Sequence, residues 1–278
     1  FFKPVDIAKK YNTKWVLVTG ASSGIGAALT EQLAQQGLNI VLVALGDALL
    51  EKQTDKLKQS YPKQHFRKIA VDLTDANGYM DLIIAGTKDI QVGAIFSNAG
   101  FFLFNAFDRI PIEKHIGHME CNMSAAVKLT HHFFGLWKQE KRRGLIVYTA
   151  SSAAFFPSPY AVLYGASKAF LNSFVESFSV EASHHNVDVC CFNPQYTRTN
   201  LYDKTMKLGI LDLFALFGSE PKDVAYTCLC SAGRVTHREQ GLYSMMMKLV
   251  GGLMFDLNWL LPIIAVALKF APEYQNIK

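Results

Sequence analysis

The sequence has few charged residues and no spacing of cysteines that suggests disulfide pairs. These two absences exclude some classes of protein. Only 18% of the 278 residues are charged, whereas 50% are hydrophobic, and this composition argues against a disordered chain. The five cysteines are an odd number without any C-x-x-C spacing. The sequence therefore indicates neither a disulfide framework nor a zinc site, and its thiols fit a reducing compartment.

Other class-defining features are also missing. There is no internal repeat, low-complexity tract or flexible linker, which favours a single domain. The net charge is +5, and we interpret the main basic cluster, Lys141–Arg143, as a solvated helix end, so no nucleic acid is expected as a partner. The histidine pairs at 131–132 and 184–185 have no third ligand at a suitable spacing, and no metal is expected. The chain begins at Phe1 instead of Met, which we interpret as a processed or trimmed product.

Strand and helix patterns alternate along the chain at lengths suited to βαβ units. A short buried strand is predicted at residues 14–19, and further strands are predicted at residues 39–44, 66–71, 92–97, 145–149 and 187–192. Helices are predicted at residues 27–36, 49–61, 80–87, 112–139 and from 164 to about 184. This alternation predicts an α/β fold with a doubly wound parallel sheet, which binds ligands at the carboxyl ends of its strands.

A glycine-rich turn, GASSGIG at Gly20–Gly26, joins the first strand to the first of these helices. Its glycines let the backbone approach a pyrophosphate, and the helix dipole favours the negative charge. The turn lacks the Gly-Lys-Ser/Thr ending of a P-loop. It favours a dinucleotide site over an ordinary strand-to-helix turn. Asp72 and Asn98–Gly100 follow the third and fourth strands, on the same rim of the sheet.

The stretch YGASK places Tyr164 and Lys168 four residues apart, so on a helix both side chains project from one face. A phenol has an unperturbed pKa of about 10 and is a poor acid or base at neutral pH. An ammonium group within roughly 4–6 Å favours the phenolate. A tyrosine tuned in this way can exchange a proton with a carbinol oxygen near pH 7. A single such pair is weak evidence, because helices contain them by chance.

Five motifs together form an ordered series: TGASSGIG at Thr19–Gly26, NAG at Asn98–Gly100, Asn122, the serines at 151–152, and YGASK. The series resembles the short-chain dehydrogenase/reductase family over roughly residues 14–199. The opening segment FFKPVDIAKKYNTKWVLVTG is similar to the lead-in of membrane-bound 17β-hydroxysteroid dehydrogenases and 3-oxoacyl-CoA reductases. The resemblance implies one NAD(P)-binding domain over residues 1–278, with a Rossmann-type core at about 14–245 and an apolar helical extension at about 246–271.

The resemblance also implies roles for individual residues. Tyr164 would exchange the proton, and Lys168 would lower its pKa and hold the nicotinamide ribose. A serine would hydrogen-bond the substrate oxygen, and Asn122 would position a water in the proton relay. Family spacing, thirteen residues before the tyrosine, selects Ser151, whereas alignment of the serine doublet would select Ser152. The coenzyme would contact Tyr164 and Lys168 and the following residues of the rim: Gly20, Ser22, Ser23, Gly24, Ile25, Gly26, Asp72, Leu73, Asn98, Ala99, Gly100, Pro194, Thr197 and Thr199.

Two positions depart from the family pattern. Family members often end the second strand with Asp for NAD or follow it with Arg for NADP, but this chain has Leu45 and then Asp47. Asp47 could reach the ribose or cap the following helix. The narrower resemblance favours NADP(H), with NAD(H) as the alternative. After the sixth strand, the family's Pro-Gly becomes Pro194-Gln195. Gln restricts the backbone more than Gly does, so the nicotinamide ring could be placed differently here.

The substrate clues are apolar. Aromatic or aliphatic residues follow the NAG turn, the serine pair and Thr199: Phe101, Phe102, Phe104, Phe155, Phe156, Leu208, Ile210, Leu211, Leu213, Phe214, Leu216 and Phe217. They predict a pocket for a steroid, retinoid or long acyl chain, with core packing as the alternative.

Residues 249–268 match a membrane span in length, but Asp256 within them costs about 2.5–3.5 kcal/mol on insertion scales. An interfacial or re-entrant segment, or a helix packed against a partner protein, fits better. We therefore expect a membrane-associated protein, and the resemblance to the membrane-bound reductases implies the endoplasmic reticulum, with a mitochondrial membrane as the alternative. Family resemblance leaves a homodimer through the long helices open.

Two functions follow from the sequence. The first is an NAD(P)-dependent oxidoreductase that interconverts a ketone and a secondary alcohol on a lipid-like substrate. The second is a catalytically retired family member that serves as a structural subunit of a membrane complex.

Overall fold

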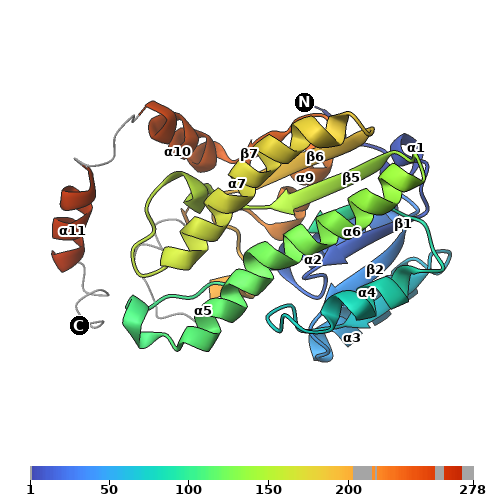
Figure 1. Cartoon of the computed structure of the whole chain (residues 1–278), viewed down its shortest axis with the longest axis horizontal. Coiled ribbons are helices and arrows are strands. Elements are labelled where there is room, and N and C mark those ends of the chain that lie inside the picture. Colours follow the sequence, from blue (N-terminus) through green and yellow to red (C-terminus); the bar gives the residue numbers. More distant parts are fainter. Residues whose placement is uncertain (1, 203–214, 217, 254–259, 271–278) are drawn as a thin grey trace.

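Seven parallel strands form one sheet in the order β3-β2-β1-β4-β5-β6-β7, with helices on both faces (Figure 1). This computed structural model describes residues 2–202, 215–216, 218–253 and 260–270. The strands are β1 Trp15–Thr19, β2 Asn39–Ala44, β3 Phe66–Ala70, β4 Val92–Ser97, β5 Gly144–Thr149, β6 Val187–Pro194 and β7 His237–Gln240. The helices are α1 Ile7–Tyr11, α2 Gly24–Gln35, α3 Ala48–Ser60, α4 Tyr79–Thr87, α5 Ile112–Met119, α6 Ala125–Gln139, α7 Val162–Ser183, α9 Pro221–Ser231, α10 Leu242–Leu253 and α11 Leu260–Phe270.

The predicted fold class, a doubly wound parallel sheet in a single domain, is confirmed. The six predicted strands agree with β1 to β6 to within two residues at each end. The apolar runs of β2, β4 and β5 are buried on both sides, as a parallel sheet with helices on both faces requires, whereas the edge strand β3 is partly exposed. The sequence did not predict β7, because its four residues, HREQ, are polar and it pairs only with β6 at the sheet edge.

Two hydrophobic cores lie on opposite faces of the sheet. On one face, Leu33 of α2 and Leu229 of α9 pack against the buried side chains that β1 and β2 direct to that face. On the other, Phe133 and Trp137 of α6 pack with side chains of α4 and α7. The Trp137 indole donates a hydrogen bond to the main-chain oxygen of Val92 at 2.8 Å, so even this large buried ring has its polar atom satisfied.

The predicted helix at residues 112–139 is interrupted at one point. Helix α5 runs into a π turn at Glu120–Ser124, after which α6 continues to Gln139. Asn122 lies in the middle of this turn. Single π turns inside α-helices occur often at functional sites, because the extra residue redirects side chains.

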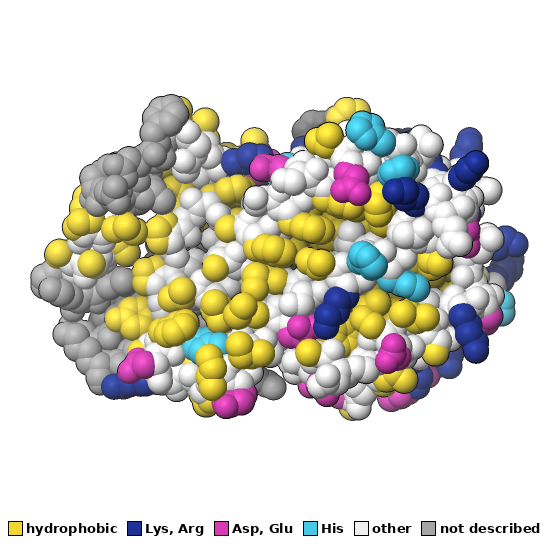
Figure 2. All heavy atoms as spheres, in the orientation of Figure 1, with side chains coloured by type: hydrophobic (Ala, Val, Ile, Leu, Met, Phe, Trp, Pro, Cys, Tyr) yellow, Lys and Arg dark blue, Asp and Glu magenta, His cyan; other side chains and the backbone are white. Residues whose placement is uncertain are grey.

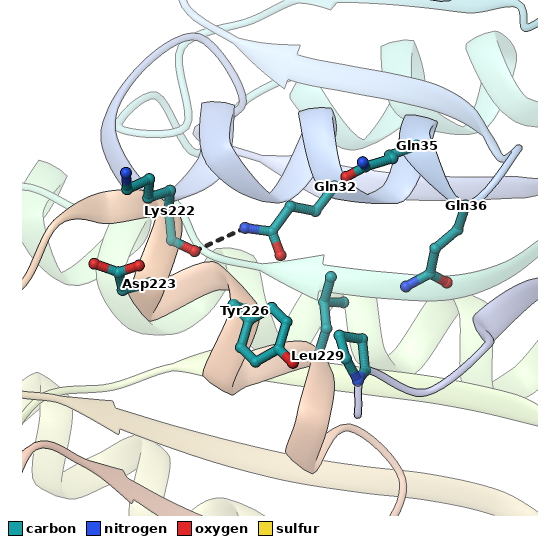
Figure 3. Close-up of a pocket in the computed structure, with 8 residues that line it drawn as sticks. Gln32, Gln35, Gln36, Lys222, Asp223, Tyr226 and Leu229 are labelled. Carbon is teal, nitrogen blue, oxygen red and sulfur yellow. Dashed lines mark hydrogen bonds between the residues drawn. The ribbon is translucent and has the colours of Figure 1, made fainter. Parts of the chain in front are cut away.

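A hollow of about 490 Å³ lies between α9 and the C-terminal half of α2 (Figure 3). Glutamine side chains line it, and Gln32 donates to the main-chain oxygen of Lys222 at 2.7 Å. Because α2 is twelve residues and about 18 Å long, this hollow is separated by most of the helix length from the glycine-rich turn at its other end.

The C-terminal helices expose many apolar side chains. Leu242, Met245, Leu249 and Leu253 of α10 are all more than half exposed, as are Ile263 and Val266 of α11. Hydrophobic side chains also gather over α6 and α7 in Figure 2. Among the helices described here, none is long and apolar enough to cross a bilayer. Asp256, which weighed against a span in the sequence, lies outside the described residues.

Candidate active site

The turns after β1 and β4, which contain predicted site residues, are neighbours at the point where the strand order reverses. Open α/β sheets bind ligands at this kind of switch point. Thr19, at the end of β1, ties the two strands together, because its hydroxyl accepts hydrogen bonds from the main-chain N–H groups of Asn98 and Ala99, both at 2.9 Å. The Asn98 side chain donates to the Thr19 carbonyl at 3.2 Å. The turn after β4 is thus fixed beside the glycine-rich turn after β1.

The glycine-rich turn has the geometry of a phosphate cradle. Gly20 and Gly24 have φ of +63° and +53°, a region that other residues seldom adopt. A Cβ on Gly26 would lie 2.0 Å from the Gly20 carbonyl oxygen, so only glycine fits. Helix α2 starts at Gly24, and the Ser23 side chain makes no capping bond to it. Because the Ser23 side chain does not cap the helix, the first main-chain N–H groups of α2 can donate hydrogen bonds to an anion. The cradle therefore fits the pyrophosphate of a dinucleotide.

The turns after β6 and β3 lie on the same rim. A Cβ on Gly24 would be 3.0 Å from Cγ2 of Thr199, which places Thr199 over the glycine-rich turn. Asp72 is exposed, and its carboxylate accepts bonds from the main chain and hydroxyl of Thr74 at 2.8 and 2.7 Å. The following Leu73 is buried.

Asp47 caps α3, which was one of its two predicted alternatives. Its carboxylate accepts hydrogen bonds from the main-chain N–H groups of Leu49 and Leu50, at 3.0 and 3.1 Å. Leu45 beside it is exposed, so the end of β2 offers an apolar surface.

Tyr164 and Lys168 lie one turn apart near the start of α7, and both are buried. The Lys168 ammonium donates to the Thr149 carbonyl at 2.9 Å and lies 5.5 Å from the centre of the Tyr164 ring. Burial lowers the pKa of Lys168 to about 8. An ammonium group at this distance favours the phenolate and so lowers the pKa of a phenol, as the sequence predicts.

Asn122 and Gly100 complete the group. The Asn122 side chain pairs with the main chain of Phe101, because its Oδ1 accepts from the N–H and its Nδ2 donates to the carbonyl, both at 3.1 Å. A Cβ on Gly100 would lie 3.3 Å from Asn122 Oδ1 and 3.5 Å from Lys168 Nζ. The NAG turn, the asparagine and the lysine are therefore in contact around one point.

Both candidate serines follow β5. Ser151 starts a short 3-10 turn, Ser152–Phe155, and its hydroxyl accepts a bond from the Ala153 N–H at 3.2 Å. Ser151 and Ser152 are both buried. Burial does not distinguish them, so Ser151 remains the prediction from family spacing.

Gln195 turns its side chain toward the end of β7. Its Nε2 donates to the Ser219 hydroxyl at 3.0 Å, and a Cβ on Gly241 would lie 2.0 Å from its Oε1. Gly241 has φ of +87°. The larger residue after Pro194 is thus accommodated by a glycine 46 positions later, and Thr197 closes the turn with a bond to the Gln195 carbonyl at 3.0 Å.

Aromatic rings from the predicted substrate segment adjoin the tyrosine. The Phe102 ring meets the Tyr164 ring edge-on at 4.9 Å between centroids, and Phe104 stacks on Phe102 at 6.2 Å. Phe155 contacts α10, since a Cβ on Gly251 would lie 3.1 Å from its carbonyl oxygen. Of the predicted apolar residues from 208 to 217, only Leu216 lies among the described residues, and it is exposed.

Sequence reasoning missed His118. This wholly buried imidazole lies one helical turn before Asn122, with Nε2 3.1 Å from Asn122 Nδ2. The four-residue spacing to Asn122 is the signal that could have indicated it. Over the residues that the structure describes, no group of three His, Cys, Asp or Glu side chains is placed to hold a metal ion.

Residues 14–207 match the family model of the short chain dehydrogenases. A very-long-chain 3-oxoacyl-CoA reductase-like protein of Arabidopsis thaliana is 28% identical over 81% of this chain and 72% of its own length. Hydroxysteroid dehydrogenase-like protein 1 of Gallus gallus is 30% identical over 71% of this chain, which spans 59% of that protein. The human protein named inactive hydroxysteroid dehydrogenase-like protein 1 is 27% identical over 86% of this chain and 71% of its own length.

Solved structures share the fold. A short-chain dehydrogenase from Sphingobium yanoikuyae in complex with NADPH superposes with a TM-score of 0.72, at 25% identity, over 87% of this chain and 95% of that chain. A 7beta-hydroxysteroid dehydrogenase superposes with a TM-score of 0.77 over 89% of this chain and all of its own, at 21% identity.

Proposed function

We propose that this chain, which belongs to the short-chain dehydrogenase family of oxidoreductases, interconverts a ketone and a secondary alcohol on an apolar, lipid-like substrate. One observation supports this most: a buried Tyr164–Lys168 pair adjoins Asn122 and the NAG turn on the rim of the glycine cradle. A site that no longer performed chemistry would have no need to keep a buried ammonium beside a phenol.

Each residue has a role in the proposed mechanism. When bound, the coenzyme would supply or accept the hydride. The glycine cradle and the N–H groups of α2 bind the pyrophosphate, and Thr199 lies over them. Tyr164 passes its proton to the substrate oxygen, and the charge of Lys168 favours the resulting phenolate. Ser151 donates a hydrogen bond to the same substrate oxygen.

Asn122 has a structural part in the same mechanism. Its side chain binds both polar groups of the Phe101 main chain. It therefore fixes the turn after β4 against the π turn and holds Gly100 beside Lys168. In our proposal, this arrangement positions a water that passes a proton through Lys168 to the Tyr164 phenolate, which thereby regains the proton it gave to the substrate.

The substrate class follows from the surroundings of Tyr164. Phe102 and Phe104 place aromatic surface beside the phenol, which suits a fused-ring or acyl substrate. The names of relatives, a 3-oxoacyl-CoA reductase-like protein and 7beta-hydroxysteroid dehydrogenases, are consistent with a long acyl or steroid ketone.

We propose NADP(H) as the coenzyme, with NAD(H) as the alternative. An NAD site commonly presents a carboxylate near the end of β2 to the ribose hydroxyls. Here Asp47 is bound to two main-chain N–H groups of α3. The structural neighbour from Sphingobium yanoikuyae is a complex with NADPH, which supports the choice.

Titration of the protein with NADPH and NADH, followed by nucleotide fluorescence, tests this function. We expect saturable binding of NADPH, with NADH weaker by at least about tenfold, or about 1.4 kcal/mol. Comparable binding of both would correct the coenzyme choice alone. Binding of neither would contradict the enzyme and favour the second candidate, a retired family member in a membrane complex, to which the name of the inactive human relative also points.

We further propose that α10 and α11 place the enzyme on a membrane surface. Apart from Lys248, which pairs with Glu239, their exposed large side chains are aliphatic residues and methionines, and α10 packs beside Phe155 near the candidate serines. Figure 2 shows hydrophobic side chains gathered at the end of the molecule that contains α11. A lipid substrate could then pass from the bilayer toward Tyr164. From the family resemblance we propose the membrane of the endoplasmic reticulum, with a mitochondrial membrane as the alternative.

Charge placed on this surface should weaken binding to vesicles. We expect Leu249→Glu, at a side chain that is 57% exposed, to lower partitioning onto phosphatidylcholine vesicles by about tenfold or more, because a buried leucine contributes about 1.5–3 kcal/mol. Leu82→Glu on α4, at a side chain that is 55% exposed, is the matched control and should change little. Equal loss in both variants, or no binding by the wild type, would exclude α10 as the contact.

A further inference from the structure

His118 occupies a position that the proposed mechanism does not use. Its ring is 0% exposed and lies on α5, one turn before Asn122. The ring of Phe101 meets it edge-on at 5.0 Å, and the ring of Tyr164 lies 6.4 Å away. One imidazole thus contacts Asn122 and also lies beside the proposed proton donor.

The hydrogen bonds fix the protonation state of this ring. The main-chain N–H of Phe101 can only donate, so the Asn122 atom that faces it is Oδ1. The amide nitrogen of Asn122 therefore points the other way, and its two hydrogens reach the Phe101 carbonyl and His118 Nε2, both at 3.1 Å. In this arrangement His118 Nε2 accepts from Asn122, which indicates a neutral ring whose proton is on Nδ1; Nδ1 is buried and has no hydrogen-bond partner among the described residues.

The surroundings favour the same neutral state. Burial lowers the pKa of His118 to about 4; the charges of Lys168 and His115 act in the same direction, and the main chain of Phe101 acts against them. Lys168 and Tyr164 face the ring from α7, and His115 lies on its own helix. A protonated His118 would lose its bond to Asn122 and place a second cation near Lys168.

We propose that His118 is a positioning residue for the reaction, acting through Asn122. By accepting the second hydrogen of the Asn122 amide, it fixes the amide plane and with it the turn at Gly100, against which Lys168 lies. Its neutral ring also leaves Lys168 as the cation beside Tyr164. This inference rests on the proposed oxidoreductase function for its kinetic consequence, but the protonation state and the hydrogen bond do not depend on that function.

Three variants test the kinetic consequence. We expect His118→Leu, which removes the acceptor from a buried amide, to lower kcat about 10- to 100-fold while NADPH affinity stays within about twofold. His118→Gln can present a side-chain oxygen near the place of Nε2 and should restore kcat to within about fivefold of wild type. His115→Gln is the matched control, because that buried imidazole binds the Phe107 carbonyl at 2.9 Å and does not contact Asn122. Wild-type kcat in His118→Leu, or no recovery in His118→Gln when both bind NADPH normally, would overturn the proposal.

A second measurement needs neither substrate nor turnover. In nitrogen-15 NMR spectra of the imidazoles of the free protein, we expect His118 to have an unprotonated Nε2 and a protonated Nδ1 down to about pH 5. A protonated Nε2 at pH 7, or a ring that titrates near the ordinary histidine pKa of about 6.5, would overturn the inference whether or not the chain is an enzyme.

Discussion

The variant Tyr164→Phe should lose at least about 10³-fold in kcat, because the phenylalanine ring keeps the packing against Phe102 but has no proton to transfer. Its affinity for NADPH should stay within about twofold of the wild-type value, since the change removes one oxygen atom outside the glycine cradle. Steady-state kinetics with whichever ketone is turned over, and nucleotide fluorescence titration, measure the two quantities.

Two kinds of control accompany this variant. Tyr226→Phe makes the same chemical change on α9, beside the hollow of Figure 3, and should leave kcat unchanged. In the same assay, Ser151→Ala should lower kcat by about 100-fold, whereas Ser152→Ala should stay within about threefold; the reverse order would identify Ser152 as the catalytic serine. Turnover by Tyr164→Phe at the wild-type rate would refute the proton-transfer role.

The variant Gly26→Ala should lose nucleotide binding by at least about 100-fold, or about 2.8 kcal/mol. Its new Cβ would lie 2.0 Å from the Gly20 carbonyl oxygen and 2.8 Å from Asn98 Nδ2, so the turn must open at the point where the pyrophosphate should bind. Fluorescence titration with NADPH measures the loss, and thermal unfolding reports whether the fold survives.

Gly135→Ala is the matched control for this backbone effect. Gly135 also lies in a helix, α6, but a Cβ there would meet nothing within 4 Å. We expect unchanged NADPH affinity and equal or slightly higher stability, since alanine favours helices over glycine by about 1 kcal/mol. A folded Gly26→Ala variant that binds NADPH as tightly as Gly135→Ala would mean that the cradle is not the coenzyme site.

Most of the strands and the glycine-rich turn could be predicted, because both depend on residues that are neighbours in the sequence. The alternation of strand and helix patterns indicated six of the seven strands, and the glycine spacing indicated a turn whose positive φ values and close contacts exclude other residues. The meeting of Asn98–Gly100 with the Gly20–Gly26 turn follows from the strand order, since the carboxyl ends of β1 and β4 are neighbours at the switch point.

Other features could not be predicted, because they depend on contacts between residues that are far apart in the sequence. Gln195 fits because Gly241 leaves space for its side chain, and no local pattern links the two positions. The edge strand β7 is held by pairing to β6, not by hydrophobicity. His118 belongs to no motif, and the four-residue spacing to Asn122 was its sole local signal; the structure shows the contact between the two side chains.

Hydride transfer itself can be followed directly. The protein is incubated with NADPH that carries deuterium on the transferring face of nicotinamide C4 and with steroid and 3-oxoacyl ketones, and the alcohol products are analysed by mass spectrometry. We predict that at least one product contains a single deuterium at its carbinol carbon, and that Tyr164→Phe forms none of it on the same timescale. Tight binding of the labelled coenzyme without deuterium in any alcohol, from any ketone of either class, would contradict the account.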